Sequence, residues 1–205
     1  MNAEMILEYL SMVSNQNLAV NLIMHLVILG AVFAVFAVKN ILLKKLIVNS
    51  AILILSLSVL INAWIYGNPF HLVTFAILAG FAGWELLTGK NNFHTPEMNS
   101  ITLIALVFIV LGLWYPDFVE VNKVQSLLFA PVGIVPCPTL LVTLGLLSLA
   151  YTRINMLQYV VTITMGLIFG IIGTFVLKVY LDVSLLLAVL FSLWILVQRK
   201  KYSAG

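Results

Sequence analysis

The chain has very little charge for its length. Only 8% of its 205 residues are charged, while 63% are hydrophobic, and the mean hydropathy is +1.16. A soluble domain carries roughly 25% charged residues to cover its surface. The shortage excludes an ordinary soluble globular protein and predicts that most of the surface faces lipid. We therefore expect an integral membrane protein in which residues 1–205 form a single transmembrane domain.

Cysteine is nearly missing too, because Cys137 is the only one. A single cysteine excludes a disulfide within the chain and a metal site built from paired cysteines. The first residues carry Glu4 and Glu8 but no basic residue, unlike the start of a secretory signal peptide. No phosphate-binding loop or zinc-protease motif is present. We therefore predict no cofactor, and an enzyme is the least expected functional class.

Long apolar segments, each about the length of a spanning helix, recur along the whole chain. Crossing a bilayer as a helix takes about 20 mostly apolar residues. The segments expected to cross are 19–38, 46–66, 70–87, 100–115, 126–150, 156–179 and 183–198. The pattern predicts an all-α, polytopic transmembrane helical bundle of about seven spans. Residues 1–18 precede the first span, and they fit either an interfacial helix on the outer side or the frayed start of that span.

The basic residues fall unevenly on the two sides of the predicted bundle. One side receives eight of them, namely Lys39, Lys44, Lys45, Lys90, Arg153, Arg199, Lys200 and Lys201, whereas the other receives Lys123 and Lys178. Cytoplasmic loops carry the excess of Lys and Arg. We therefore expect a bacterial-type inner (plasma) membrane protein with its N-terminus outside and its C-terminus in the cytoplasm. The same placement accounts for the net charge of +3, so nucleic acid is not an expected partner.

The fifth predicted span contains three prolines close together: Pro131, Pro136 and Pro138. Proline lacks the backbone N–H and disfavours helix at the residue before it. We therefore predict that this span is discontinuous at Pro136–Pro138. From Thr139 onward, the remaining helix would be only about 18 Å long. Irregular backbone at membrane depth is tolerated only where protein or water covers it, which favours a polar cavity there. A dry, proline-kinked helix is the alternative.

Polar residues inside the predicted spans indicate where such a cavity would lie, because polar groups in hydrocarbon are costly. The candidate pocket consists of His25, Asn62, Tyr66, His71, Asp117, Pro136, Cys137, Pro138 and Thr139. A hydrogen-bonded packing network is the alternative interpretation of the same residues. Cys137 with His25 and His71 makes a weak candidate for soft-metal binding. Gly166 and Gly170 follow a small-xxx-small pattern and predict close helix packing.

The run PCPTLLVTLGLLSLA, from Pro136 to Ala150, resembles the signature of an uncharacterised bacterial integral-membrane family catalogued as a domain of unknown function. The stretch from Trp64 to Phe70 and the Trp-Tyr-Pro after the fourth span fit the same pattern. Many family members have a second threonine where this chain has Leu140. The resemblance implies a membrane protein and no particular activity. A weaker resemblance to nickel and cobalt exporters rests on the Pro-Cys-Pro run, without the histidine-rich motifs of those proteins.

Two functional classes remain open from the sequence. The first is a small-solute or ion transporter or channel with a polar pocket at the broken fifth helix. The alternative is a membrane-embedded binding, sensory or scaffold subunit that acts with a partner protein. Transport predicts a path that reaches both faces, whereas a scaffold predicts a dry bundle. The expected partners are the lipid bilayer and either a second copy of the chain or another membrane protein.

Overall fold

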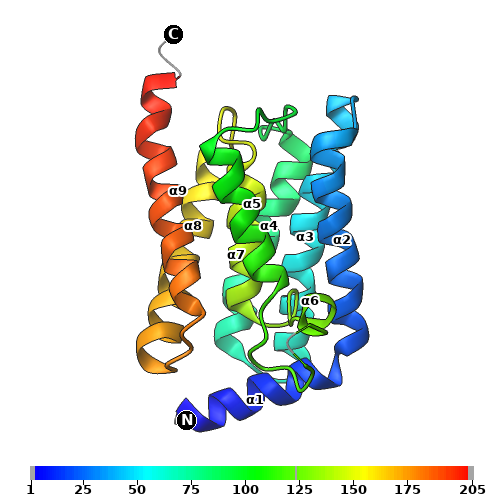
Figure 1. The fold of residues 1–205 in the computed structure, drawn as a ribbon, viewed down its shortest axis with the longest axis vertical. Helices are drawn as coiled ribbons and strands as arrows, with labels where there is room; N and C mark the ends of the chain where they lie inside the picture. Colours follow the sequence, from blue (N-terminus) through cyan, green and yellow to red (C-terminus); the bar gives the residue numbers. More distant parts are fainter. Residues whose placement is uncertain (1–2, 123, 203–205) are drawn as a thin grey trace.

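The computed structural model describes residues 3–122 and 124–202, with only the backbone described for the last four. Lys123, one of the two basic residues expected on the outer side, lies outside the described residues, as do residues 1, 2 and 203–205. Most helices run side by side, while α1 lies across one end of the bundle (Figure 1). The helices are α1 Ala3–Gln16, α2 Leu18–Ala37, α3 Ile41–Ile65, α4 Pro69–Thr88, α5 Ser100–Leu113, α6 Ser126–Phe129, α7 Pro136–Ser148, α8 Met156–Ile171 and α9 Asp182–Tyr202, with a π-helical segment Ile172–Val176 after α8.

Asparagine side chains fix where several of these helices begin. The side chains of Asn40, Asn68, Asn99 and Asn155 each accept a hydrogen bond from a backbone N–H in the first turn of α3, α4, α5 and α8. These N–H groups have no acceptor within the helix, so a capping side chain stabilises the helix start. At the other end of α4, Gly89 adopts the left-handed conformation that commonly terminates helices. The short connections are therefore encoded locally.

Four helices are long and apolar enough to cross a membrane: α2, α3, α4, and α8 with its π-helical extension. The chain is thus a membrane protein by the length and composition of its helices. The remaining predicted spans contain shorter apolar helices, α5, α7 and residues 182–198 of α9. At 14 and 13 residues, α5 and α7 are only about 20 Å long, less than the roughly 30 Å of the hydrocarbon core.

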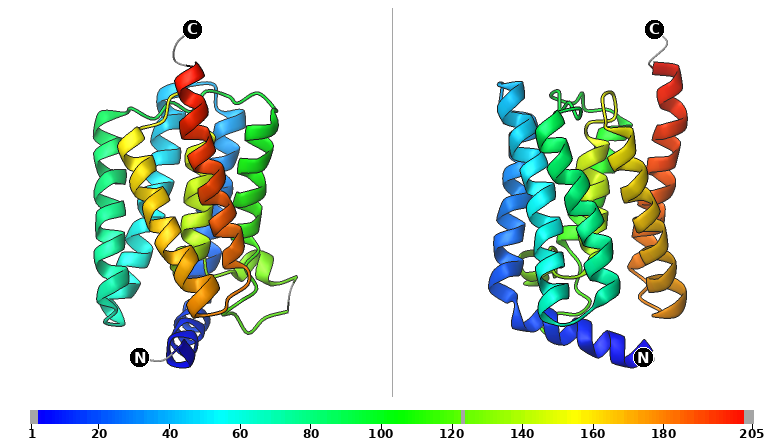
Figure 2. Two further views of the ribbon diagram at one scale, coloured as in Figure 1. Left: turned by 90° about the vertical axis from the view of Figure 1, so that its left-hand side faces the viewer. Right: turned by 180° about the vertical axis from the view of Figure 1, so that it is seen from behind.

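The loops alternate between the two ends of the bundle. The connections that carry Lys39, Lys90 and Arg153 lie at the end where α9 terminates (Figures 1 and 2). The opposite end carries α1, residues 114–122 and 124–135, and the turn 177–181. This alternation follows the order of predicted spans, so basic loops gather at one end of the molecule.

Helix α7 forms the centre of the bundle. It packs against α3, α5, α8 and α9, and every residue from 130 to 150 is buried except Cys137. The approach of α5 is especially close, because Gly112 on α5 and Gly145 on α7 each leave too little space for a Cβ atom. The core therefore surrounds one short helix that is buried along its length except at Cys137.

The predicted break in the fifth span is real but lies earlier in the chain. Helix α6 ends at Phe129, residues 130–135 are not helical, and α7 begins at Pro136. The prediction of a break at Pro136–Pro138 is therefore wrong in position. Both prolines lie in the first turn of α7, where a backbone N–H would have no acceptor within the helix. Proline starts this helix instead of interrupting it.

Hydrogen bonds hold the non-helical segment before α7 in a compact turn. The N–H of Val135 donates to the carbonyl of Pro131 at 2.8 Å, and Gly133 has a φ of +79°. The Thr139 hydroxyl accepts from the N–H of Gly133 at 2.8 Å and donates to the carbonyl of Val135 at 2.7 Å. Thr139 thus satisfies buried backbone groups that the irregular turn leaves without helical partners.

Helix α1 is a separate element, so the interpretation of residues 1–18 as the frayed start of the first span is wrong. It buries Leu10, Val13 and Ser14 against the bundle. The side chain of Asn15 accepts from the N–H of Glu120 at 2.8 Å and donates to the carbonyl of Phe118 at 3.2 Å. These contacts tie α1 to the segment between α5 and α6.

Gly166 and Gly170 lie at helix contacts, where the small-xxx-small pattern places them. A Cβ atom on Gly166 would lie 3.0 Å from Val189 of α9 and 3.2 Å from Leu144 of α7. A Cβ atom on Gly170 would lie 2.7 Å from Leu186 of α9. The two glycines let α8 approach α9 closely.

Candidate functional site

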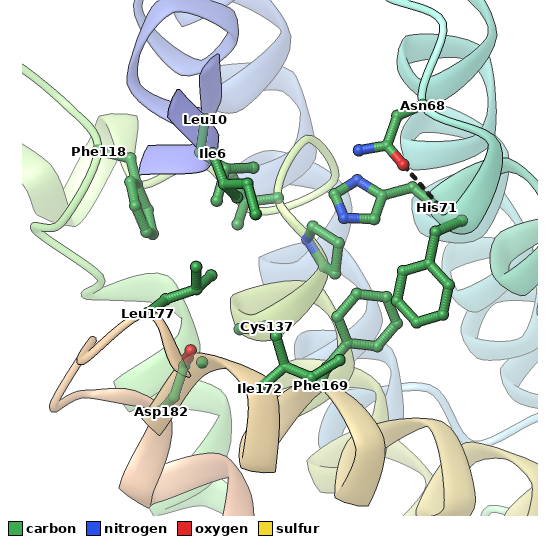
Figure 3. A pocket seen from close by; sticks show the side chains of 14 residues that line it. Ile6, Leu10, Asn68, His71, Phe118, Cys137, Phe169, Ile172, Leu177 and Asp182 are labelled. Atoms are coloured by element: carbon green, nitrogen blue, oxygen red, sulfur yellow. Dashed lines mark hydrogen bonds between the residues drawn. The ribbon is translucent and has the colours of Figure 1, made fainter. Parts of the chain in front are cut away.

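A cavity of about 250 Å³ lies beneath α1 (Figure 3), and α1 lies at the end of the bundle opposite the basic loops (Figure 1). Residues from α1, α4, α7, α8, the π-helical segment and α9 reach it. Its lining consists of Ile6, Leu10, Asn68, Phe70, His71, Phe118, Val135, Pro136, Cys137, Phe169, Ile172, Gly173, Leu177 and Asp182. Three of the nine residues predicted for the pocket are among them: His71, Pro136 and Cys137.

Most of the cavity wall is apolar, and one side of it is aromatic. The ring centroids of Phe70 and Phe169 are 5.1 Å apart, and those of His71 and Phe169 are 5.5 Å apart. Phe118 reaches the cavity from the segment between α5 and α6 (Figure 3). A largely apolar pocket with a few polar groups is the usual form of a small-molecule site.

The start of α4 positions His71. The side chain of Asn68 accepts a hydrogen bond from the N–H of His71 at 3.1 Å, and Pro69 occupies the first turn. This cap sets the beginning of the helix, and the imidazole then points into the cavity (Figure 3). The ring lies against Phe169 of α8, so the local sequence Asn-Pro-Phe-His aims a polar ring at an aromatic wall.

The polar edge of the cavity consists of Cys137 and Asp182. Cys137 follows the first residue of α7 and is the one residue from 130 to 150 that is not fully buried. Its thiol lies close to the carboxylate of Asp182, and Asp182 is only 2% exposed. The hydroxyl of Tyr115 donates a hydrogen bond to the same carboxylate. Tyr115, Asp182 and Cys137 thus form a connected group at the cavity edge.

Gly173 makes room for this carboxylate. A Cβ atom at position 173 would overlap the Asp182 side chain. Gly173 belongs to the π-helical segment that ends α8, and Asp182 lies in the first turn of α9. Departures from the α-helix of this kind are frequent at functional sites. The irregular helix end therefore brings Asp182 against Cys137.

Three of the predicted pocket residues lie elsewhere. The buried ring of His25 contacts the carbonyls of Asn21 at 2.8 Å and Leu113 at 3.0 Å, which joins α2 to α5. Asn62 donates to the carbonyl of Ser58 at 2.9 Å. Tyr66 donates to the side chain of Gln16 at 2.9 Å. Placing His25, Asn62 and Tyr66 in one pocket with Cys137 is therefore wrong, because helical spacing identifies a face but not its neighbours.

Asp117, Pro138 and Thr139 also do not line the cavity. Asp117 lies half-buried in the segment after α5. Pro138 is buried in the first turn of α7, and Thr139 hydrogen-bonds within the preceding turn. Within residues 3–122 and 124–198, no group of three His, Cys, Asp or Glu side chains is arranged to hold a metal ion. His71 and Cys137 share the cavity, but His25 does not.

Sequence analysis missed Asp182 as a site residue. It lies in the short gap between the predicted spans 156–179 and 183–198. Its signal in the sequence is an acidic residue directly before an apolar helix, which is also a common position for a helix-stabilising carboxylate. Only its proximity to Cys137, 45 positions earlier in the numbering, reveals the second role.

A second buried polar cluster lies at the opposite end of the bundle. The carboxylate of Glu85 accepts from the N–H of Asn91 and, at 2.6 Å, from the side chain of Asn155. The Asn91 side chain donates to Gln158 at 2.7 Å and to Asn49 at 3.2 Å. Each of the five residues is bonded to another member of the group. The cluster joins the 89–99 loop to α3, α4 and α8 and serves the fold.

No protein family, curated protein or solved structure matches the chain. The resemblance carried by Pro136 to Ala150 therefore stays a prediction, and the site is interpreted from its geometry.

Proposed function

We propose that the protein is a membrane-embedded binding protein that receives a small, largely apolar molecule in the cavity beneath α1. The observation that carries this proposal is the cavity itself, about 250 Å³ in volume, with Cys137, Asp182 and His71 among apolar walls. Convergent polar groups in an apolar pocket are the usual signature of a ligand site. Of the two classes left open by the sequence, the geometry favours the binding subunit.

A simple channel receives less support because the cavity ends on α7. All residues from 138 to 150 are buried, and α5 approaches α7 closely at Gly145. A permanently open path would need polar, water-filled space along this helix. The tight packing around α7 therefore favours a pocket accessible from one end.

For the arrangement in the membrane, we propose seven crossings with the α1 end outside. The eight basic residues predicted for the other side support this orientation. The short helix α7 completes its crossing with the irregular residues 130–135, all of which are buried, and α5 continues into residues 114–119, none of which is exposed. Irregular backbone inside a membrane needs such cover.

A carrier is the second candidate, favoured by two helix interruptions beside the cavity. Residues 130–135 interrupt the fifth predicted span, and the π-helical segment with the turn 177–181 ends the sixth. Carriers bind their substrates where discontinuous helices meet. In this alternative, the cavity beneath α1 is the outward-facing state of the binding site. Uptake of a ligand into sealed proteoliposomes would distinguish a carrier from a binding protein.

The proposal predicts that Cys137 reacts with a small, membrane-impermeant methanethiosulfonate added to intact cells. The thiol is the only one in the chain and lines the cavity, so labelling reports cavity access directly. Mass spectrometry of the purified protein would measure the modified fraction over time. The Cys137→Ser variant gives the background.

A matched control moves the thiol along the same helix. Thr143→Cys in the Cys137→Ser background places it six residues further along α7, in the packed core, where Thr143 is 5% exposed. This variant should react only after unfolding. If Cys137 in the folded protein stays unmodified from both sides of the membrane, the binding proposal is wrong. Reaction only in inside-out vesicles would overturn the orientation and leave the cavity in place.

A further inference from the structure

We infer that the ligand of the cavity is a small organic cation, with Asp182 as its counter-charge and the aromatic wall as its second contact. This inference rests on the proposed binding function and names the class of ligand. It follows from three features of the cavity: a buried carboxylate that forms no ion pair among the described side chains, aromatic rings in the wall, and a small apolar volume.

The first feature is the charge of Asp182. Asp182 is 2% exposed and lines the cavity. The Tyr115 hydroxyl donates a hydrogen bond to its carboxylate, and the thiol of Cys137 lies close to it, so both neighbours are uncharged side chains. Within the described side chains, no basic residue forms an ion pair with it, and Lys178, the nearest basic residue in sequence, is exposed. A buried charge is costly unless an opposite charge accompanies it. A cationic ligand would supply that charge.

The second feature is the aromatic wall across the cavity from Asp182. Phe70 and Phe169 lie within 5.1 Å of each other, centroid to centroid, and Phe118 borders the same space (Figure 3). The face of an aromatic ring attracts a cation electrostatically, and quaternary ammonium groups are recognised in this way. A carboxylate opposite phenyl rings therefore favours an ammonium group over a neutral or anionic one.

The third feature separates an organic cation from a metal ion. Hard metal cations need about six oxygen ligands, whereas the polar side chains of the lining are Asn68, His71, Cys137 and Asp182 alone. The remaining lining is hydrocarbon, which suits the apolar part of an amine. A volume of about 250 Å³ is near the lower end for small-molecule sites. The ligand class is thus an amine or quaternary ammonium compound of modest size.

The test uses the full-length protein, purified in detergent, and three probes of similar shape. Benzyltrimethylammonium carries the charge, neopentylbenzene replaces the charged nitrogen by carbon, and phenylacetate carries a negative charge. Each probe is titrated by calorimetry and by its protection of Cys137 from labelling. We expect benzyltrimethylammonium to bind at least about tenfold more tightly than neopentylbenzene, because both the carboxylate and the rings favour the charge.

Variants assign this preference to individual residues. Asp182→Asn should abolish the preference for the cation and leave the affinity for neopentylbenzene within about threefold. Glu120→Gln removes an exposed carboxylate at the same end of the bundle and should change neither affinity. Phe169→Leu removes one ring without changing the charge. It should weaken the binding of benzyltrimethylammonium more than the binding of neopentylbenzene, so it decides the question if Asp182→Asn does not fold.

Two results would overturn the inference. One is equal or tighter binding of neopentylbenzene or phenylacetate in the unmodified protein. The other is an absence of binding by all three probes. In either case, Cys137 that is still labelled from outside would leave the proposed binding function standing, because cavity access is measured without any of these probes.

Discussion

Enlarging either glycine at the α5–α7 contact should destabilise the bundle, and the geometry allows the size of the effect to be worked out. A Cβ atom on Gly145 would lie 2.6 Å from the side chain of Ile109 and 2.9 Å from the carbonyl oxygen of Ala105. A Cβ atom on Gly112 would lie 2.5 Å from the side chain of Val142. Carbon atoms in contact prefer about 3.5–4.0 Å, so the helices would have to separate by about 1 Å.

The helices cannot relieve this strain by rotating one side chain, because backbone atoms are part of both contacts. On Gly145 the carbonyl of Ala105 is close, and on Gly112 the backbone nitrogen of Val142 would lie at 3.3 Å. Overpacking of a core costs about 1–3 kcal/mol. Replacing glycine by alanine in a helix itself favours folding by about 0.5–1 kcal/mol. The cost of the close contact is therefore measured by comparison with a glycine-to-alanine substitution at a helical position that has no close neighbours.

Gly80 on α4 provides that reference, since it is exposed and a Cβ atom there would meet nothing within 4 Å. The free energy of unfolding would be measured by denaturant titration in detergent micelles. Gly145→Ala and Gly112→Ala should each be less stable than Gly80→Ala by about 1–3 kcal/mol. The double variant should lose less than the sum, because separating the helices once relieves both contacts.

Equal stability of Gly145→Ala and Gly80→Ala would refute the reasoning. It would mean that α5 does not approach α7 as closely as described. A loss in the double variant equal to the sum of the single losses would show that the two glycines act independently, contrary to a shared contact.

Two further predictions concern buried hydrogen bonds, each with a matched control. Thr139→Val should lower the free energy of unfolding by about 1–3 kcal/mol, because the buried N–H of Gly133 loses its acceptor. In the control Thr143→Val, only a hydrogen bond to a helical carbonyl is lost, so the free energy of unfolding should fall by less than about 1 kcal/mol. Glu85→Gln should lower the free energy of unfolding by about 2–3 kcal/mol, because the new amide NH₂ group would face one of the two N–H donors that now bond to the carboxylate. Its control, Glu97→Gln, lies at an exposed position and should change the free energy of unfolding by no more than about 0.5 kcal/mol. Denaturant titration measures all four, and a pair of equal losses in either comparison would contradict the assigned bonds.

Hydropathy was enough to locate the helices, because each apolar segment must satisfy its backbone internally as a helix. It could not locate the interruption before α7 correctly. The sequence Pro-Cys-Pro fits the interior of a kinked helix and the first turn of a new helix equally well. Only the turn at residues 130–135, held by Thr139, distinguishes the two.

The site was harder to predict than the helices for a related reason. Cys137 and His71 attracted notice as polar residues in apolar segments, and both line the cavity. His25 attracted the same notice, yet its ring bonds to carbonyls within the core. In the sequence, Asp182 has the features of a loop residue. In the structure, the π-helical segment brings it close to α7. Which faces meet depends on helix packing, and the sequence of one chain contains no direct measure of it.

The enclosure of α7 has a consequence for how the protein is made. Helix α7 is about 20 Å long and leaves the ribosome before α8 and α9, the helices that cover two of its sides. Until they arrive, two sides of this short helix would lack their protein neighbours and face lipid, although α7 is too short to cross the hydrocarbon core alone. Stable insertion of α7 is therefore coupled to the synthesis of the last quarter of the chain, from Met156 onward. A ribosome stalled at the loop after α7 would hold a nascent protein whose central helix has not yet entered the membrane stably.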